Sequence, residues 1–491
     1  MMSIFSKKAD KPKKDKTPGS KLDRELPYVV TLITIMAASG ISPFGSFTKL
    51  ARYQLLPNIM KEARKIVNRV HVLGDDPLTA MEERANRTQS TQFRDLLMGY
   101  VATVRNGGDI ASFLQSKMHS IFEYETAVAR QSIAKIGGLV DAYMIMQVIA
   151  LSLYVVVVAL SSMPSSSLLP ASMSSPVMSY FIVFVLLPAI SMAIMYALDK
   201  TITSTLVGAA DVLRQGVTMS VGAIASFALL SLTGISLPIK GEYLFPIFLV
   251  GASVWPAYKM LKTERNMRGM EAELPSYLRD IAESRKAGLS PEKCVIYASE
   301  RLRKGEFQSV VKAFANQLEW GVPLRKIYAN LSSAMRSYSA LVHFRILIEA
   351  IESGGGYTTS LDILAKSSEA TANTEKEKAS MLKPYFIIAF MVTAMMSVTT
   401  LMVSQTFVEV GQNILPGAAT TQQDSGVFAI GIAAQSWMTG FLMGKISTGS
   451  FAAGFRYAIM LVAISTFATV MTLELGITPS VFMPTSSLPG T

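Results

Sequence analysis

Seven apolar stretches, each close to the length of a membrane-crossing helix, limit most strongly how this chain can fold. A helix needs about 20 residues to cross about 30 Å of hydrocarbon. The stretches lie at 139–162, 177–198, 217–238, 243–261, 384–409, 427–446 and 455–477. Their number and length predict an all-α integral membrane protein. Pro246 and Pro256 interrupt the fourth stretch, so six to eight crossings fit the sequence.

Charged residues divide the chain into four blocks. Residues 1–138 carry 21 Lys or Arg and 13 Asp or Glu, and residues 262–383 carry 19 and 15. The other two blocks, 139–261 and 384–491, together carry only 6 basic and 7 acidic residues. Over the whole chain 16% of residues are charged, below the roughly 25% of soluble domains. The composition therefore excludes soluble, secreted, disordered and coiled-coil proteins.

This alternation predicts the domain organisation. Apolar positions recur every three or four residues within the charged blocks, which indicates two cytoplasmic bundles of about six helices each. We predict a basic disordered tail (1–23), a first cytoplasmic helical-bundle domain (24–138), transmembrane helices 1–4 (139–261), a second cytoplasmic helical-bundle domain (262–383), transmembrane helices 5–7 (384–477) and an extracytoplasmic tail (478–491).

The distribution of Lys and Arg predicts the orientation, because cytoplasmic loops carry an excess of them. With residues 1–138 inside, Lys240 alone among the 46 basic residues faces the exterior. We therefore predict a multi-pass protein of the cell membrane with a cytoplasmic N-terminus. The lysine-rich segment before Ser20 is either a solvated tail or a ligand of anionic headgroups. Phe5 is its only aromatic residue, so we expect no binding of nucleic acid.

The two charged blocks repeat one another. Glu-Leu-Pro occurs at 25–27 and 273–275, and Gly-x-Ser-Pro at 40–43 and 288–291, so matched positions lie 248 residues apart. A glycine pair follows each Gly-x-Ser-Pro motif in the same register. Self-similarity of this kind indicates a duplicated unit of soluble domain plus membrane helices. The glycines are predicted to form structural turns at Gly40, Gly107, Gly108, Gly288, Gly355 and Gly356.

This pattern resembles the platform (F) domain of type II secretion and type IV pilus machines. Two copies with extra crossings are similar to the archaeal platform of the archaellum and of adhesive pili. The resemblance implies a hexameric secretion ATPase docking below and pilin or archaellin subunits passing into a filament above. A homodimer would suit such an ATPase by symmetry. The sequence leaves open which of the two filaments is served.

Basic residues of the two bundles are the candidates for docking the ATPase: Arg52, Lys61, Arg64 and Lys65 in the first, and Arg279, Arg285 and Lys286 in the second. The alternative is that they line solvated helix faces. Lys135 and Lys383 stand just before a crossing and are the candidate coupling joint. Asp141 and Glu409 lie at the ends of crossings, where they face headgroups or contact another helix. Asp109 and Tyr357 differ after the glycine pair, so a docking site there would not be equivalent in the two bundles.

We expect neither enzyme, metal nor cofactor. Cys294 is the only cysteine, and the three histidines lack ligand spacing. The segment Gly440 to Ile446 resembles a phosphate loop, but it has one residue too few and no Ser or Thr after its lysine. A secondary transporter with duplicated halves is the main alternative, and it would need polar residues at mid-membrane. An intramembrane enzyme would need a nucleophile and a base within a crossing.

Overall fold

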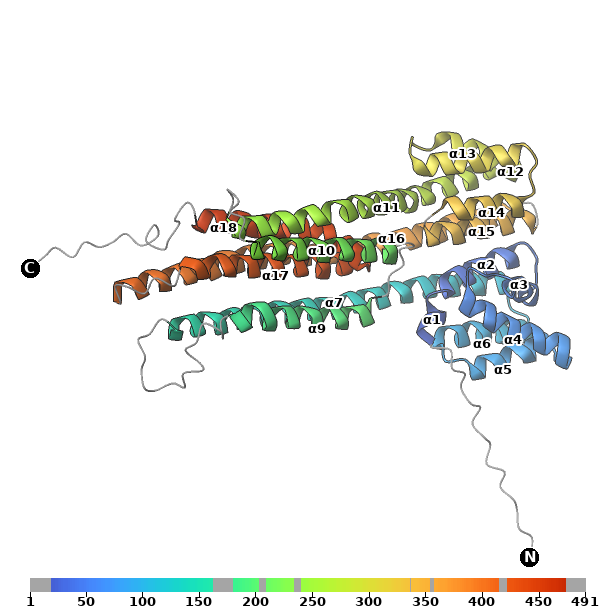
Figure 1. Cartoon of the computed structure of the whole chain (residues 1–491). Coiled ribbons are helices and arrows are strands. Elements are labelled where there is room, and N and C mark those ends of the chain that lie inside the picture. The colour runs from blue at the N-terminus through green and yellow to red at the C-terminus, as the bar shows by residue number, and fades with distance from the viewer. Residues whose placement is uncertain are drawn as a thin grey trace, which may run out of the picture. The chain divides into compact units, whose positions relative to one another are not determined.

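The computed structural model describes residues 19–161, 180–202, 209–233, 240–335, 337–353, 357–414 and 422–473 (Figure 1). All regular structure in these ranges is helical, which confirms the predicted all-α class. The chain divides into two compact units. We call Met1–Arg130 with Asn266–Glu377 the charged unit, and Gln131–Arg265 with Lys378–Thr491 the membrane unit. Three long helices, α7, α11 and α16, contribute residues to both.

The charged unit contains both repeats, so the two predicted bundles pack together as one body. The first repeat comprises α1 (Gly19–Asp23), α2 (Leu26–Ala38), α3 (Pro43–Leu50), α4 (Pro57–Leu73), α5 (Pro77–Arg87), α6 (Thr91–Arg105) and the first part of α7 (Ile110–Ser161). The second comprises the last part of α11 (Gly241–Lys286), α12 (Pro291–Arg301), α13 (Glu306–Glu319), α14 (Leu324–Ala334), α15 (Tyr338–Glu352) and the first part of α16 (Thr358–Ile414). Helix α1 lies within the segment predicted as a tail, and its Leu22 is buried.

The helices of the two repeats keep the register seen in the sequence. Helices α3 and α12 both begin at a proline, and α7 and α16 begin 248 residues apart. Gly40 and Gly288 adopt φ values of +76° and +93°, in the left-handed region that favours glycine. The serine before each proline accepts a hydrogen bond from a backbone N–H three residues later, which caps the new helix. The internal repeat is thus confirmed at the level of helix order and capping.

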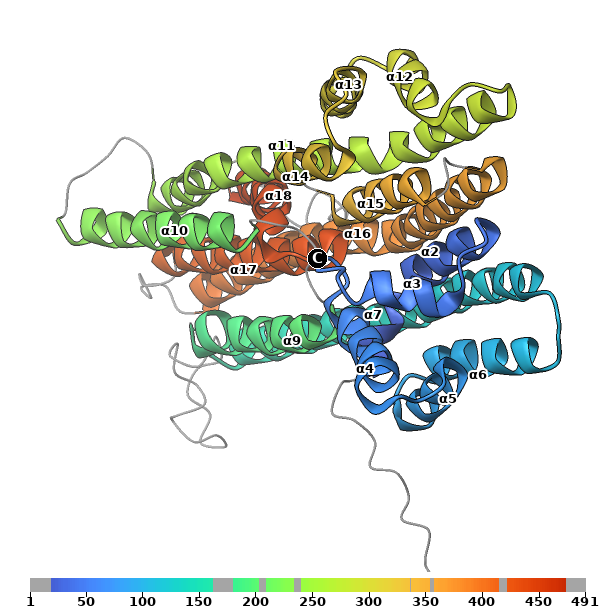
Figure 2. The same ribbon diagram turned by 90° about the vertical axis from the view of Figure 1, so that its right-hand side faces the viewer.

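Helix α2 lies at the centre of the charged unit, between α7 of its own repeat and α15 of the second (Figures 1 and 2). Ten of its 13 residues are buried, as expected for a helix that is apolar on every side. Thr31 Oγ1 lies 2.8 Å from Ser367 Oγ of α16, and the rings of Tyr28 and Tyr338 meet edge to face. The first repeat therefore uses α2 to bind the second.

The matching helix of the second repeat, residues 274–286 of α11, has a different character. Leu32 and Ile35 of α2 are buried, whereas the matching residues of α11 are Asp280 and Glu283. Likewise Thr31 is matched by the exposed Arg279. The surface by which α2 contacts a neighbouring repeat is therefore polar in α11. A polar outer face is typical of the terminal unit of a repeat array, because no further unit covers it.

A charged cluster joins the two repeats at α3 and α15. Lys49 Nζ lies 2.6 Å from Oε1 of Glu349, whose side chain is only 6% exposed. Tyr53 donates a hydrogen bond of 3.3 Å to the other carboxylate oxygen, and Arg345 Nη2 lies 3.6 Å from it. Burial raises the pKa of Tyr53, so it keeps the proton that it donates. Glu349 thus receives two cations and one hydroxyl in a site largely closed to water.

His343 on α15 makes the charged unit sensitive to acid. The ring is fully buried, its Nδ1 donates to the carbonyl of Ser339 at 2.8 Å, and Nε2 has no hydrogen-bond partner among the described residues. Burial lowers the pKa of His343 from 6.5 to about 4. Between pH 6.5 and about pH 4 the histidine is protonated in the unfolded chain but not in the folded chain. The free energy of unfolding therefore decreases as the pH is lowered, and it levels off below the folded-state pKa. Between pH 7 and pH 4.5 the expected loss is about 2 kcal/mol.

This loss is measured as the difference between the wild type and His343→Leu in denaturant unfolding at pH 7 and pH 4.5. Burial raises the pKa of Glu25 and Glu271, so these carboxyls favour the folded state as the pH falls. Their contribution is common to both proteins and cancels in the difference. An equal pH dependence in the two proteins would contradict the prediction.

Among the described residues, the membrane unit contains seven helices that are long and apolar enough to cross a membrane, the number predicted from the sequence. They are the second part of α7, the π-helical turn η1 (Ile182–Leu186) with α9 (Leu187–Thr201), α10 (Ala209–Leu232), the first part of α11, the second part of α16, α17 (Gln422–Thr448), and the turn η2 (Phe451–Ala453) with α18 (Gly454–Leu473). The chain is thus a multi-pass membrane protein.

Helices α17 and α18 form a close hairpin. A Cβ added at Gly440 would overlap the backbone of Ala458, and one added at Gly444 would overlap the backbone of Gly454. Small residues four apart let membrane helices approach until their backbones touch. The glycines that imitate a phosphate loop are therefore packing residues.

The two ends of the membrane unit differ in chemistry. At one end Lys445 Nζ lies 2.7 Å from Asp199 Oδ1, and Arg456 donates two hydrogen bonds, of 2.7 and 3.3 Å, to the buried Glu264. These pairs bring together the ends of α9, α17 and α18 with α11. At the other end of α17, Phe428 packs between Tyr154 and Tyr180. One end is thus bound by ion pairs and the other by aromatic rings.

Candidate functional site

The exposed face of α11 in the second repeat carries two of the predicted docking residues. Arg279 forms an ion pair with Glu369, and Lys286 Nζ lies 2.9 Å from Asp362 Oδ1, both acids belonging to α16. The basic side chains are 58% and 53% exposed. Hydrogen bonds from Lys366 and Lys286 lower the pKa of Asp362. Such exposed pairs contribute little to stability, so a partner can replace them at small cost.

The third predicted residue of this group has a different role. Arg285 Nη1 donates to the backbone oxygen of Leu289 at 2.8 Å and stabilises the turn after α11. The structure adds three residues that the sequence analysis missed, the exposed Arg301, Arg303 and Lys304 at the end of α12. Arg301 lies 3.9 Å from Asp280, which places this basic segment beside the α11 face. The sequence Arg-Leu-Arg-Lys at 301–304 could have indicated this basic segment.

The candidates of the first repeat lie on α4 and the segment before it. Arg52 and Lys61 are exposed. Arg64 Nε donates to the carbonyl of Ala51 at 2.9 Å, and Lys65 Nζ lies 3.2 Å from Glu62 Oε1. Arg64 and Lys65 thus stabilise the local fold, and the charge of Lys61 acts on the carboxylate of Glu25.

The candidate coupling residues lie at matching positions of α7 and α16. Lys135 and Lys383 are both exposed. Two residues further along, a Cβ added at Gly137 would overlap the ring of Tyr385, again a matching pair. Ile133, Ile136 and Leu382 are buried in the same cluster. The two helices are therefore in close contact beside these lysines.

The remaining candidates do not form a cluster. Asp141 is an exposed residue of α7. Glu409 belongs to α16, in a stretch whose side chains lie outside the described residues. Gly107 has a left-handed φ of +69°, and Gly108 follows it before α7 begins. Gly355 and Gly356 lie outside the described residues.

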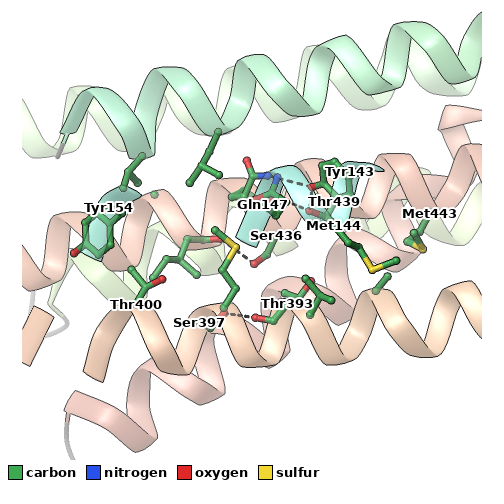
Figure 3. Close-up of a pocket in the computed structure, with 18 of the residues that line it drawn as sticks. Tyr143, Met144, Gln147, Tyr154, Thr393, Ser397, Thr400, Ser436, Thr439 and Met443 are labelled. Atoms are coloured by element: carbon green, nitrogen blue, oxygen red, sulfur yellow. Dashed lines mark hydrogen bonds between the residues drawn. The ribbon is translucent and has the colours of Figure 1, made fainter. Parts of the chain in front are cut away.

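A polar cavity lies within the membrane unit among α7, η1, α9, α16 and α17 (Figure 3). Its volume is about 30 Å³. Apolar atoms form most of its wall, and we call it the polar cavity for the hydroxyl and amide groups that reach it. The polar residues that line it are Tyr143, Gln147, Thr393, Ser397, Thr400, Gln435, Ser436 and Thr439. The sequence analysis missed this site, because single polar residues in apolar stretches carry no pairing information.

A hydrogen-bond network connects three helices at the cavity. Gln435 Nε2 of α17 donates to Ser191 Oγ of α9 at 2.7 Å and to Tyr143 Oη of α7 at 3.1 Å. Tyr143 Oη also lies 2.7 Å from Thr439 Oγ1. All four side chains are buried. In a hydrocarbon environment a satisfied polar network of this kind holds helices together.

Among the described residues, no group of three or more His, Cys, Asp or Glu side chains could hold a metal ion. A family model for protein F of the type II secretion system matches residues 29–158 and 277–404. The two matches begin 248 residues apart and together cover just over half of the chain. The chain belongs to the type II secretion F family. It contains two F domains, which agrees with the internal repeat.

Proteins of the type II secretion F family are membrane platform proteins of secretion and pilus systems. An uncharacterized protein of Methanocaldococcus jannaschii is 21% identical over 401 residues, which cover 76% of this chain and 67% of that protein. No solved structure matches the chain.

The two F domains account for only part of the polar cavity. Tyr143 and Gln147 fall within the first F match, and Thr393, Ser397 and Thr400 within the second. The residues on α9 and α17 lie outside both matches. The cavity is therefore built where the two F domains meet helices that neither match includes.

Proposed function

We propose that this F-family protein is the non-catalytic membrane platform of a filament machine. It docks a cytoplasmic hexameric secretion ATPase and couples ATPase cycling to the assembly or rotation of an archaellum or type IV pilus-like filament built from pilin or archaellin. The observation that carries the proposal is the pair of F domains, each running into membrane-crossing helices. We expect the platform to be a homodimer, because twofold symmetry is compatible with the sixfold symmetry of a hexameric ATPase.

The ion-paired end of the membrane unit supports a cytoplasmic location for the charged unit. Lys445 and Arg456 belong to loops that the positive-inside rule places in the cytoplasm. Asp199 and Glu264, their partners, lie in segments that the same rule places on that side. Three segments, at Asp199, at Glu264 and at the Lys445 to Arg456 connection, thus agree on one side of the membrane.

The ATPase docks on the second repeat, through α11 and the end of α12. The matching face of the first repeat is buried, because α2 uses it to bind α15 and α16. The α11 face is exposed, and Arg301, Arg303 and Lys304 add three positive charges beside it. Exposed charges contribute orientation and association rate more than affinity. An acidic surface on the ATPase would replace Glu369 and Asp362 as the partner of these cations.

The double variant Arg279→Glu/Lys286→Glu tests this assignment. We expect at least a tenfold loss of ATPase recovered with the tagged protein from its own membranes, and cells without filaments. Folding should be intact, because each lost pair is exposed and contributes at most about 1 kcal/mol. The matched control is Arg52→Glu/Lys61→Glu in the first repeat, which should retain both ATPase and filaments.

Two outcomes would move the docking site. Normal recovery of ATPase with the α11 variant would remove the second repeat from consideration. Loss with the Arg52→Glu/Lys61→Glu control alone would assign docking to the first repeat. Co-purification of archaellin or pilin with the wild type would identify the filament.

The polar cavity is the one observation that favours a transporter instead. Its volume of about 30 Å³ suits about one water molecule rather than an organic solute. Uptake of labelled solutes into vesicles that contain the protein would revive the transporter alternative.

A further inference from the structure

The polar cavity of the membrane unit contains more hydrogen-bond acceptors than donors. Ser191 Oγ donates to the carbonyl of Leu187 at 3.1 Å, and Thr439 Oγ1 donates to the carbonyl of Gln435 at 2.9 Å. Each hydroxyl has one hydrogen, and helix backbone carbonyls use both of these. Tyr143 must therefore be the donor in its contact with Thr439.

This accounting fixes the orientation of the two glutamine amides. Gln435 contacts Ser191 and Tyr143, whose hydrogens are already used, so only its NH₂ group can face them. The same holds for Gln147, which approaches Ser191 at 3.5 Å through Nε2. A flipped amide would place a carbonyl oxygen against an oxygen with no hydrogen to give. Both Oε1 atoms are therefore the free ends of the amides.

Three buried oxygens at the cavity then need a partner. Gln147 Oε1, Gln435 Oε1 and Thr400 Oγ1 have no hydrogen-bond partner among the described residues. All three side chains are at most 5% exposed and line the same cavity. An unpaired polar group within hydrocarbon costs several kcal/mol. Two of the three atoms can only accept, so the missing group is a donor.

We propose that the cavity binds a structural water molecule that donates to both glutamine carbonyls. A water needs roughly 10–15 Å³ of such space and two to four polar partners, and the cavity offers about 30 Å³ and three. A monovalent cation fits less well, because no carboxylate of the described residues lines the site to balance its charge. The water joins α7 and α17, and Thr400 of α16 lines the same cavity.

Such a water would let α16 move against its neighbours. Thr393, Ser397 and Thr400 form a hydroxyl row, at intervals of four and three residues, on the α16 face toward the cavity (Figure 3). A direct hydrogen bond between side chains holds α16 in one position. A water molecule can instead transfer its hydrogen bond from one hydroxyl of this row to the next as α16 moves. This role is independent of where a soluble partner docks.

The substitution Gln147→Met tests the water site, because it removes one carbonyl while nearly conserving volume. With a bound water, the variant loses one bond to the water and its unfolding temperature in detergent falls by several degrees. Without a ligand, the variant loses only the long 3.5 Å contact with Ser191 together with an unpaired buried acceptor, and becomes equally or more stable. Gln215→Met, on an exposed face of α10, is the matched control; it loses one exposed hydrogen bond from Lys259, which contributes little, and should leave the temperature nearly unchanged.

A cryo-EM density map of the wild type provides the second measurement, should the variant fail to fold. A peak within hydrogen-bond distance of both Oε1 atoms supports the proposal. A map that resolves the two glutamine side chains but has no such peak overturns it. Unfolding temperatures measured in sodium, potassium and choline chloride distinguish a bound water from a bound cation. Equal temperatures support water, whereas stabilisation by sodium or potassium alone would replace water with a cation.

Discussion

Replacing Gly444 by leucine is expected to prevent the membrane unit from folding. A side chain at this position would enter the backbone of Gly454, and a backbone cannot move aside as a flexible side chain can. Overpacking of an adaptable core costs about 1–3 kcal/mol, so we expect a loss above this range. The measurement is the fraction of detergent-extracted protein that elutes as a single species, followed by its unfolding temperature.

Gly251→Leu is the matched control for this change. Gly251 is also a glycine of a membrane-unit helix, but a Cβ there meets no atom within 4 Å. We expect this variant to elute and unfold as the wild type does. If Gly444→Leu behaved in the same way, α17 and α18 could not be packed as closely as described.

The substitution Glu349→Ala is expected to destabilise the charged unit by about 2 kcal/mol. Removing one partner of a buried ion pair leaves the other charge without compensation. Here Lys49 and Arg345 would both lose the carboxylate that joins α3 to α15. Urea unfolding followed by tryptophan fluorescence or circular dichroism would measure the change.

Two variants show whether burial is the cause. Glu352→Ala removes a neighbouring acid whose partner, Arg325, is 77% exposed at 3.7 Å, and should cost less than about 1 kcal/mol. Glu349→Leu combined with Lys49→Met removes the charges of that pair, leaves the partly exposed Arg345 in place, and should recover part of the loss. A single-variant effect as small as that of Glu352→Ala would contradict the role given to the cluster.

Much of the fold could be predicted because its signals are local. A run of about 20 apolar residues indicates a crossing without knowledge of its neighbours. The Gly-x-Ser-Pro motif dictates a left-handed glycine and a capped helix within four residues, and both copies show this geometry at Gly40 and Gly288. The repeat was visible because both copies keep these local requirements.

The sites depend on contacts that no local signal contains. Arg279 and Arg285 look alike in sequence, yet one faces solvent and the other caps its own helix. Gln147 and Gln435 are 288 residues apart and meet only because α7 and α17 pack against α9. The sequence shows that α2 is apolar where the matching part of α11 is polar. The reason for this difference becomes clear only from the structure, in which the two repeats share one core.

The central position of α2 has a consequence for biosynthesis. Thr31 and its partner Ser367 are 336 residues apart, so at about 5–20 residues per second the ribosome needs about 20–70 s to deliver the partner. Throughout that interval the face of this 13-residue apolar helix that binds α15 and α16 has no cover, and the helix is shorter than the roughly 20 residues that would let it insert across the membrane. Nascent chains that stop before α15 should therefore depend on chaperones, and should be the first to aggregate when translation is interrupted.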